Sequence, residues 1–102
     1  MEKSDEAHGE ELRLDFTYAR TALFVRQTLA LALRLPLNQE FTWPFLKDRV
    51  CDPTDTILPK RIVLVGISAL RSSLPEEAAM LLGVFRELRL LRPDIKVMVV
   101  LH

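Results

Sequence analysis

The sequence predicts a small α/β domain built on a three-stranded parallel sheet that is packed by helices. Two apolar runs, at residues 62–67 and 95–101, support this prediction because they lack the polar alternation of a sheet with one solvated face. The helical pattern of residues 75–91 lies between them. A strand, a helix and a second strand in this order normally form a right-handed parallel crossover, so the two runs should share one sheet.

The chain begins with a segment that is not expected to fold. Residues 1–11 hold five acidic side chains, one lysine and no large apolar side chain after Met1. Such a segment has little to bury, so it should form a mobile acidic tail, and the folded domain should span residues 12–102. At residues 12–16 apolar and charged side chains alternate, which is typical of a short, half-buried strand.

Two helices should follow this strand. The pattern of residues 18–35 is helical and apolar around most of its circumference, which is typical of a helix sandwiched inside a domain. Thr17 can cap its start, and Pro36 should end it because the residue before a proline avoids the helical conformation. The second helix should begin after Thr42, whose hydroxyl can accept an otherwise unsatisfied amide hydrogen bond.

Helical periodicity divides the second helix into two sides. Pro44 is tolerated in its first turn, where the missing N–H costs little. One face should enter the core, with the tryptophan buried against the sheet: Trp43, Leu46 and Val50. Four side chains should point away from that face: Phe41, Pro44, Phe45 and Asp48.

The second half of the chain should start with a loop at residues 51–61, which is rich in proline and aspartate. Ser73 and Glu76 have the spacing of a capping box, so they should start the helix of residues 75–91. Gly83 costs this helix about 1 kcal/mol relative to alanine. Close approach of another element would explain the glycine, and sequence drift without a purpose is an equal alternative.

Composition argues against several function classes. Fourteen basic and fourteen acidic side chains cancel, so no basic surface indicates nucleic-acid binding. Cys51 is the single cysteine, and no pattern of metal ligands surrounds it. The acidic, polar start of the sequence is unlike a signal peptide, so none is expected, and no apolar run reaches the roughly 18 residues that a membrane span needs. We therefore expect a cytoplasmic protein with no cofactor and no membrane partner.

Catalysis is not expected either. The two histidines, His8 and His102, lie near the ends of the chain without a neighbouring group that could position them as bases. The three glycines never cluster as a phosphate-binding loop requires. Asp52 and Asp55 lie on a loop with two prolines, where aspartate more often forms turns than binds a metal.

Residues 35–50, LPLNQEFTWPFLKDRV, resemble the signature of the barstar family of intracellular ribonuclease inhibitors. The order of predicted strands and helices over residues 12–102 also resembles that family, as does the ending VFRELRLLRPDIKVMVVLH. Glu40 and Pro44 depart from the family pattern, which has a glycine and an aspartate there. The positions that match are Leu35, Pro36, Trp43, Leu46, Asp48 and, conservatively, Val50.

The resemblance implies a barstar-like, three-layered domain that binds another protein. In that family a loop and the following helix block the active site of a ribonuclease, and carboxylates stand in for the RNA phosphate. Asp48 is the helix acid that this sequence retains, whereas Pro44 carries no charge, so the implied partner is a nuclease or toxin other than barnase. The implied partner-binding residues are Asn38, Gln39, Glu40, Phe41, Thr42, Pro44, Phe45 and Asp48.

Two functions from different classes stay open. The first is an inhibitor or immunity protein of the barstar kind, in which Phe41 and Phe45 would add an apolar centre to the interface. The second is a non-inhibitory adaptor or assembly module that reuses the fold. Both phenylalanines could instead pack under the preceding loop or against the first helix. A second possible interaction surface lies on the back of the last helix, at Ala79, Gly83 and Leu90.

Overall fold

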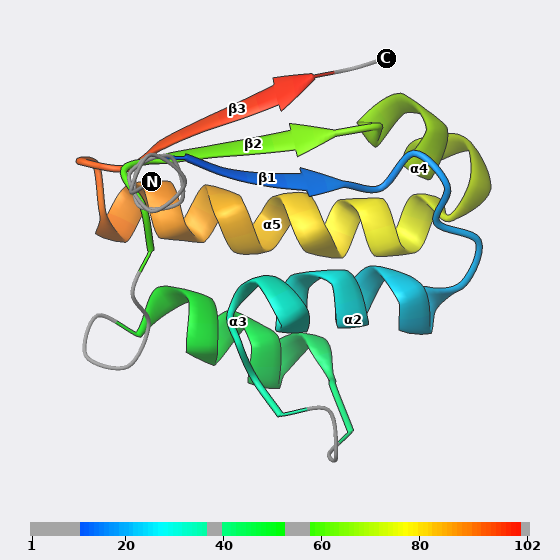
Figure 1. Cartoon of the computed structure of the whole chain (residues 1–102), viewed down its shortest axis with the longest axis horizontal. Helices are drawn as coiled ribbons and strands as arrows, with labels where there is room; N and C mark the ends of the chain where they lie inside the picture. The colour runs from blue at the N-terminus through cyan, green and yellow to red at the C-terminus, as the bar shows by residue number, and fades with distance from the viewer. Residues whose placement is uncertain (1–10, 37–39, 53–57, 101–102) are drawn as a thin grey trace, which may run out of the picture.

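The computed structural model describes residues 11–36, 40–52 and 58–100, so most of the predicted tail lies outside the described residues. Figure 1 labels the elements along the chain. They are β1 (Glu11–Asp15), α2 (Ala22–Ala32), α3 (Trp43–Cys51), β2 (Arg61–Val65), α4 (Ile67–Ser73), α5 (Pro75–Leu91) and β3 (Lys96–Val100).

The three strands form one parallel sheet in the order β1-β2-β3, which confirms the predicted fold class. The register places Leu14 beside Leu64 and Leu64 beside Val99. In the central strand Ile62 and Leu64 are fully buried, as expected for an uninterrupted apolar run.

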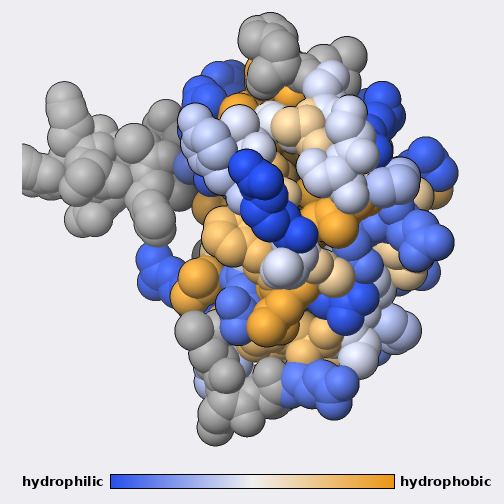
Figure 2. All heavy atoms as spheres, turned by 90° about the vertical axis from the view of Figure 1, so that its right-hand side faces the viewer, coloured by the Kyte–Doolittle hydropathy of each residue, from blue (hydrophilic) through white to orange (hydrophobic). Residues whose placement is uncertain are grey.

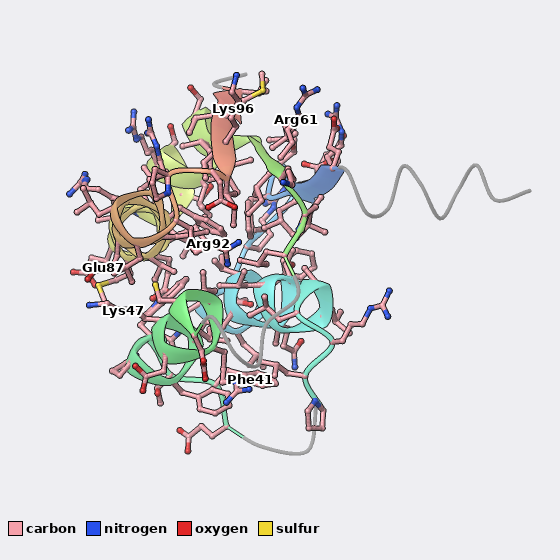
Figure 3. The ribbon with its side chains drawn as sticks, turned by 90° about the vertical axis from the view of Figure 1, so that its left-hand side faces the viewer. Phe41, Lys47, Arg61, Glu87, Arg92 and Lys96 are labelled. Atoms are coloured by element: carbon pink, nitrogen blue, oxygen red, sulfur yellow. The ribbon has the colours of Figure 1, made fainter. Side chains whose placement is uncertain are left out.

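Helices α2, α3 and α5 lie on one side of the sheet and form three layers together with it (Figure 1). Helices α2 and α5 contact the sheet through β1 and β3, and α3 packs on α5 and α2 from the far side (Figures 1 and 3). Helix α4 lies beyond the carboxyl ends of the strands (Figure 1). Figure 2 views that end of the molecule, where hydrophobic atoms form patches between hydrophilic ones and do not form one apolar face.

The last strand differs from its prediction. Residues 95–101 were expected to form a buried strand, but β3 is an edge strand in which Met98 is 49% and Val99 is 42% exposed. None of the described helices covers the outer face of the sheet (Figures 1 and 3). An apolar run indicates a strand, but it does not determine whether that strand lies at the centre or at the edge.

The first helix is shorter than predicted, because it begins at Ala22 and is capped by Thr21, whose hydroxyl accepts from the Phe24 N–H at 3.1 Å. Thr17 is not its cap. Instead, the hydroxyl of Thr17 donates to Asp15 Oδ1 at 2.6 Å. Both threonines lie before the apolar run, and the choice between them depends on the turn after β1.

Helix α4 was not predicted, and it changes the start of α5. Gly66 has a φ of 81° and lies at the turn between β2 and α4. Ser73 belongs to α4, and Leu74 is the N-cap of α5 without a side-chain hydrogen bond, so the predicted capping box is wrong. The helix itself, Pro75–Leu91, has the predicted bounds.

Candidate functional site

Helix α3 presents the candidate surface, and its sequence explains its start. The Thr42 hydroxyl accepts from the Phe45 N–H at 3.3 Å, and Pro44 occupies the first turn, as predicted. The inward face is buried and consists of Trp43, Leu46 and Val50. Trp43 is buried, as predicted, and its indole N–H donates to Glu77 of α5. The helix that carries it packs on α5 and α2 and not directly on the sheet.

The predicted partner-binding residues fall into three groups. Asn38 and Gln39 lie outside the described residues. The side chains of four others are exposed, as the prediction requires: Glu40, Thr42, Pro44 and Asp48. The two phenylalanines are the third group and differ from the prediction.

Phe41 is buried, with 3% of its surface exposed, and Phe45 is half-buried against the core. Their rings stack with centroids 6.3 Å apart, and the Phe41 carbonyl accepts from Nη1 of Arg26 at 3.5 Å. The prediction that both point outward was wrong for Phe41, which precedes the helix, where helical periodicity does not apply. It holds in part for Phe45, which lies in α3 and is half-buried. The alternative that the pair packs inward is the better description.

A groove of about 350 Å³ lies between α3 and α5. Its walls are mainly apolar and come from Trp43, Pro44 and Lys47 of α3 and from Ala79, Met80 and Gly83 of α5. A Cβ atom on Gly83 would meet nothing within 4 Å, so no described element approaches it and that explanation for the glycine fails. The two surfaces that the sequence indicated separately, Pro44 and Ala79 with Gly83, therefore meet in one groove. Leu90 lies elsewhere.

Charge around the groove is mixed. Nζ of Lys47 lies 3.8 Å from Oε1 of Glu87, and both side chains are about half exposed, as Figure 3 shows near its left edge. Asp48 is exposed between Lys47 and Arg49 in the sequence. An ion pair this open to water contributes little to stability. The charged groups can therefore rearrange to meet a partner.

Beneath the exposed face of α3 lies a polar network that the sequence did not reveal. The Glu77 carboxylate accepts from Nε and Nη2 of Arg26 at 3.2 and 3.1 Å and from Nε1 of Trp43 at 2.8 Å. The Arg26 guanidinium also lies 5.9 Å from the centre of the Trp43 ring. The network joins α2, α3 and α5, so it fixes the groove wall that Trp43 forms. Its partners are 34 and 51 residues apart, and no local pattern could have indicated it.

Metal-binding side chains do not gather in the part of the chain that the structure describes, where no group of three or more occurs. Burial raises the pKa of the Cys51 thiol, and the nearby Glu87 carboxylate adds to this effect, so the thiolate is disfavoured. His8 and His102 lie outside the described residues. No helix in the part of the chain that the structure describes is long and apolar enough to cross a membrane.

The candidate surface thus combines an apolar groove with exposed charged side chains. Comparison of the chain with models of protein families, with curated proteins and with solved structures found no match.

Proposed function

We propose that this chain is a protein-binding domain whose partner docks on the exposed side of α3 and in the groove between α3 and α5. The groove itself carries the proposal. Its volume of about 350 Å³ falls at the small end of the range for binding pockets, and its lining is mainly apolar. It can therefore accept an apolar side chain from a partner.

Gly83 supports the groove as a docking place. The glycine lies within a 17-residue helix, where it costs about 1 kcal/mol relative to alanine. The space above it is open, so packing inside the described domain gives no reason for the small residue. Access for a partner would give one, because any side chain at this position would project into the groove.

The resemblance to the barstar family suggests the kind of partner: a nuclease or toxin other than barnase, which the chain would inhibit as an immunity protein does. The exposed carboxylates of Asp48 and Glu40 support this version, since acids facing a basic active site form charge-assisted hydrogen bonds and speed association. Pro44 and the neighbouring Lys47 reduce the acidity of the same surface. A partner on this side should therefore be less basic than a typical ribonuclease.

The apolar groove favours a second version, a non-inhibitory adaptor. An adaptor needs a stable anchor, and a partner side chain between Trp43 and Met80 would supply one without any charge. The two versions share the surface and differ in what binding does to the partner. Activity of the bound partner, free and in complex, separates them.

The experiment compares two surface variants with wild type. Gly83→Leu fills the groove, and Asp48→Ala removes the retained acid; neither residue packs in the core, so both variants should fold. Partners captured from the native host are identified by quantitative mass spectrometry, and their affinity is then measured with purified proteins. Each variant should weaken binding by about 1–4 kcal/mol, as expected for interface anchors.

Ser72→Leu is the matched control, because it places an exposed leucine on α4, which does not line the groove. It should bind like wild type. Phe45→Ala is a poorer test than the sequence suggested, since Phe45 packs partly against the core and its loss lowers stability as well. Partner binding that survives both Gly83→Leu and Asp48→Ala would reject the proposed surface.

A further inference from the structure

A second groove lies between the last turns of α5 and the free edge of β3. Its volume is about 540 Å³, and it is separate from the groove at α3. The residues that line it and matter below are Arg86, Arg89 and Leu90 of α5 and Lys96, Val97 and Met98 of β3. Leu90 is 77% exposed and offers an apolar contact in the groove.

The backbone of β3 is open to pairing on this side. Among the described residues β3 pairs with β2 alone, and the Lys96 N–H donates to the Lys60 carbonyl at 2.8 Å. Because alternate residues of a strand direct their backbone groups to opposite sides, Val97 and Val99 direct theirs toward the free edge. Such an edge is a template for one more strand.

The groove is also cationic. Arg86, Arg89 and Lys96 line it, and none of the described residues that line it is acidic. Within the described ranges none of these three forms an ion pair, whereas Arg92 binds Asp94 at 3.0 Å. Figure 3 shows Lys96 at the start of β3, on the same side of the molecule as Arg61. In a chain with no net charge this is a local concentration of positive charge.

We propose that this groove binds an extended acidic segment of a partner protein, which adds to β3 as a fourth strand. The backbone groups of Val97 and Val99 would hold the segment, as in other cases of strand addition. Side chains on one face of the segment would lie over α5, where acids meet Arg86 and Arg89 and an apolar residue meets Leu90. Free backbone groups and apolar lining fit a peptide better than a nucleic acid, which would use the cations alone.

The proposal does not depend on the function assigned to α3, because the two grooves share no lining residue. It is tested by fluorescence anisotropy with the full chain and a labelled peptide in which every second residue is glutamate or leucine and threonine fills the positions between, so that acids and an apolar side chain share one face. The peptide should bind, its affinity should fall with added salt, and a peptide with lysine in place of glutamate should not bind. The same acidic peptide with N-methylated alternate residues should also lose binding, since it cannot pair with an edge strand.

Protein variants locate the site. Arg86→Glu with Arg89→Glu should weaken peptide binding at least about tenfold, because attraction becomes repulsion. Arg71→Glu, on α4, is the matched control and should leave the affinity unchanged. Val99→Pro removes one outward N–H, which an edge strand tolerates, and it should also weaken binding.

Three results would overturn the proposal. The first is an acidic peptide that binds the charge-reversed variant as tightly as wild type and binds wild type equally well after N-methylation. The second is a single-stranded oligonucleotide that competes with the peptide as well as unlabelled peptide does and binds Val99→Pro as tightly as wild type. This result would assign the groove to nucleic acid. The third is a dimer in sedimentation experiments that Val99→Pro dissociates, which would assign the edge to a second copy of the chain.

Discussion

Replacing Glu77 by alanine should loosen α3 from the rest of the domain, because one carboxylate holds both Arg26 and Trp43. Trp43 is 5% exposed, so its indole N–H cannot turn to water once the acceptor is gone. A buried donor without a partner costs about 1–3 kcal/mol. The Arg26 side chain is 29% exposed and can regain part of its hydration when the carboxylate is removed. The stability lost at Arg26 is therefore smaller than the roughly 3–5 kcal/mol lost when a fully buried ion pair is broken.

We therefore expect Glu77→Ala to lower the free energy of unfolding by about 2–4 kcal/mol. Glu77→Gln keeps an acceptor for the Trp43 N–H and loses the charge, so it should lower stability by about half as much. Arg26→Leu in the Glu77→Ala background should cost less than it does alone, because the arginine then has no carboxylate to lose. The departure from additivity should be about 1 kcal/mol or more.

Urea denaturation followed by tryptophan fluorescence measures these changes, and Trp43 is the only tryptophan, so the signal comes from the network itself. Glu87→Ala is the matched control. Glu87 is also an acid of α5 paired with a cation, but its pair with Lys47 is exposed and 3.8 Å long. The control should change stability by less than about 0.5 kcal/mol. If Glu77→Ala had an equally small effect, or if the double variant were additive, the network would not hold α3 in place.

Three further predictions concern single positions. Gly66→Ala should lower the free energy of unfolding by more than about 2 kcal/mol in a thermal melt, because φ is 81° and the new Cβ would overlap the backbone of Thr17; an unchanged melt would contradict this geometry. Gly83→Ala should raise the free energy of unfolding by about 0.5–1 kcal/mol, since the methyl group meets nothing, and a loss of stability would show that the space is filled. Thr17→Val should raise the pKa of the Asp15 carboxyl toward its ordinary value in an NMR titration, because the hydrogen bond from the Thr17 hydroxyl is the largest cause of the lowered pKa. A carboxyl group whose pKa is lowered in the folded state stabilises the fold at pH values above its ordinary pKa. This contribution is lost as the pH falls through the pKa of the folded state, so the difference in stability between wild type and Thr17→Val should shrink in acid.

The parts of the fold that could be predicted are those that local pattern determines. The central strand shows an uninterrupted apolar run, and α5 shows a helical period with Pro75 at its first position. Helix α4 could not be separated from the loop before α5, because it has only seven residues, three of them serine. Gly66 was visible in the sequence, but its left-handed backbone, which starts that helix, was not.

The candidate site was predicted only in part. Asp48 and Pro44 lie on the exposed side of α3 because a helical wheel places them correctly once the helix start is known. Phe41 was misplaced because it lies before that start. The groove depends on how α3 crosses α5, and the Glu77 network depends on side chains brought together by that crossing. Neither the groove nor the network produces a periodic pattern in the sequence.

The central position of β2 limits when the sheet can form during synthesis. Strand β1 pairs only with β2 among the described strands, so it has no hydrogen-bonding neighbour until the ribosome has passed residue 65. Until then the nascent chain holds the sequences of α2 and α3 without the sheet that α2 packs on. Closing the long loop between Asp15 and Arg61 also lowers the entropy of the chain before any contact between the two strands offsets that loss. We expect folding to begin only after the second half of the chain emerges, and mutations in β1 should mainly speed unfolding, a pattern that φ-value measurements can check.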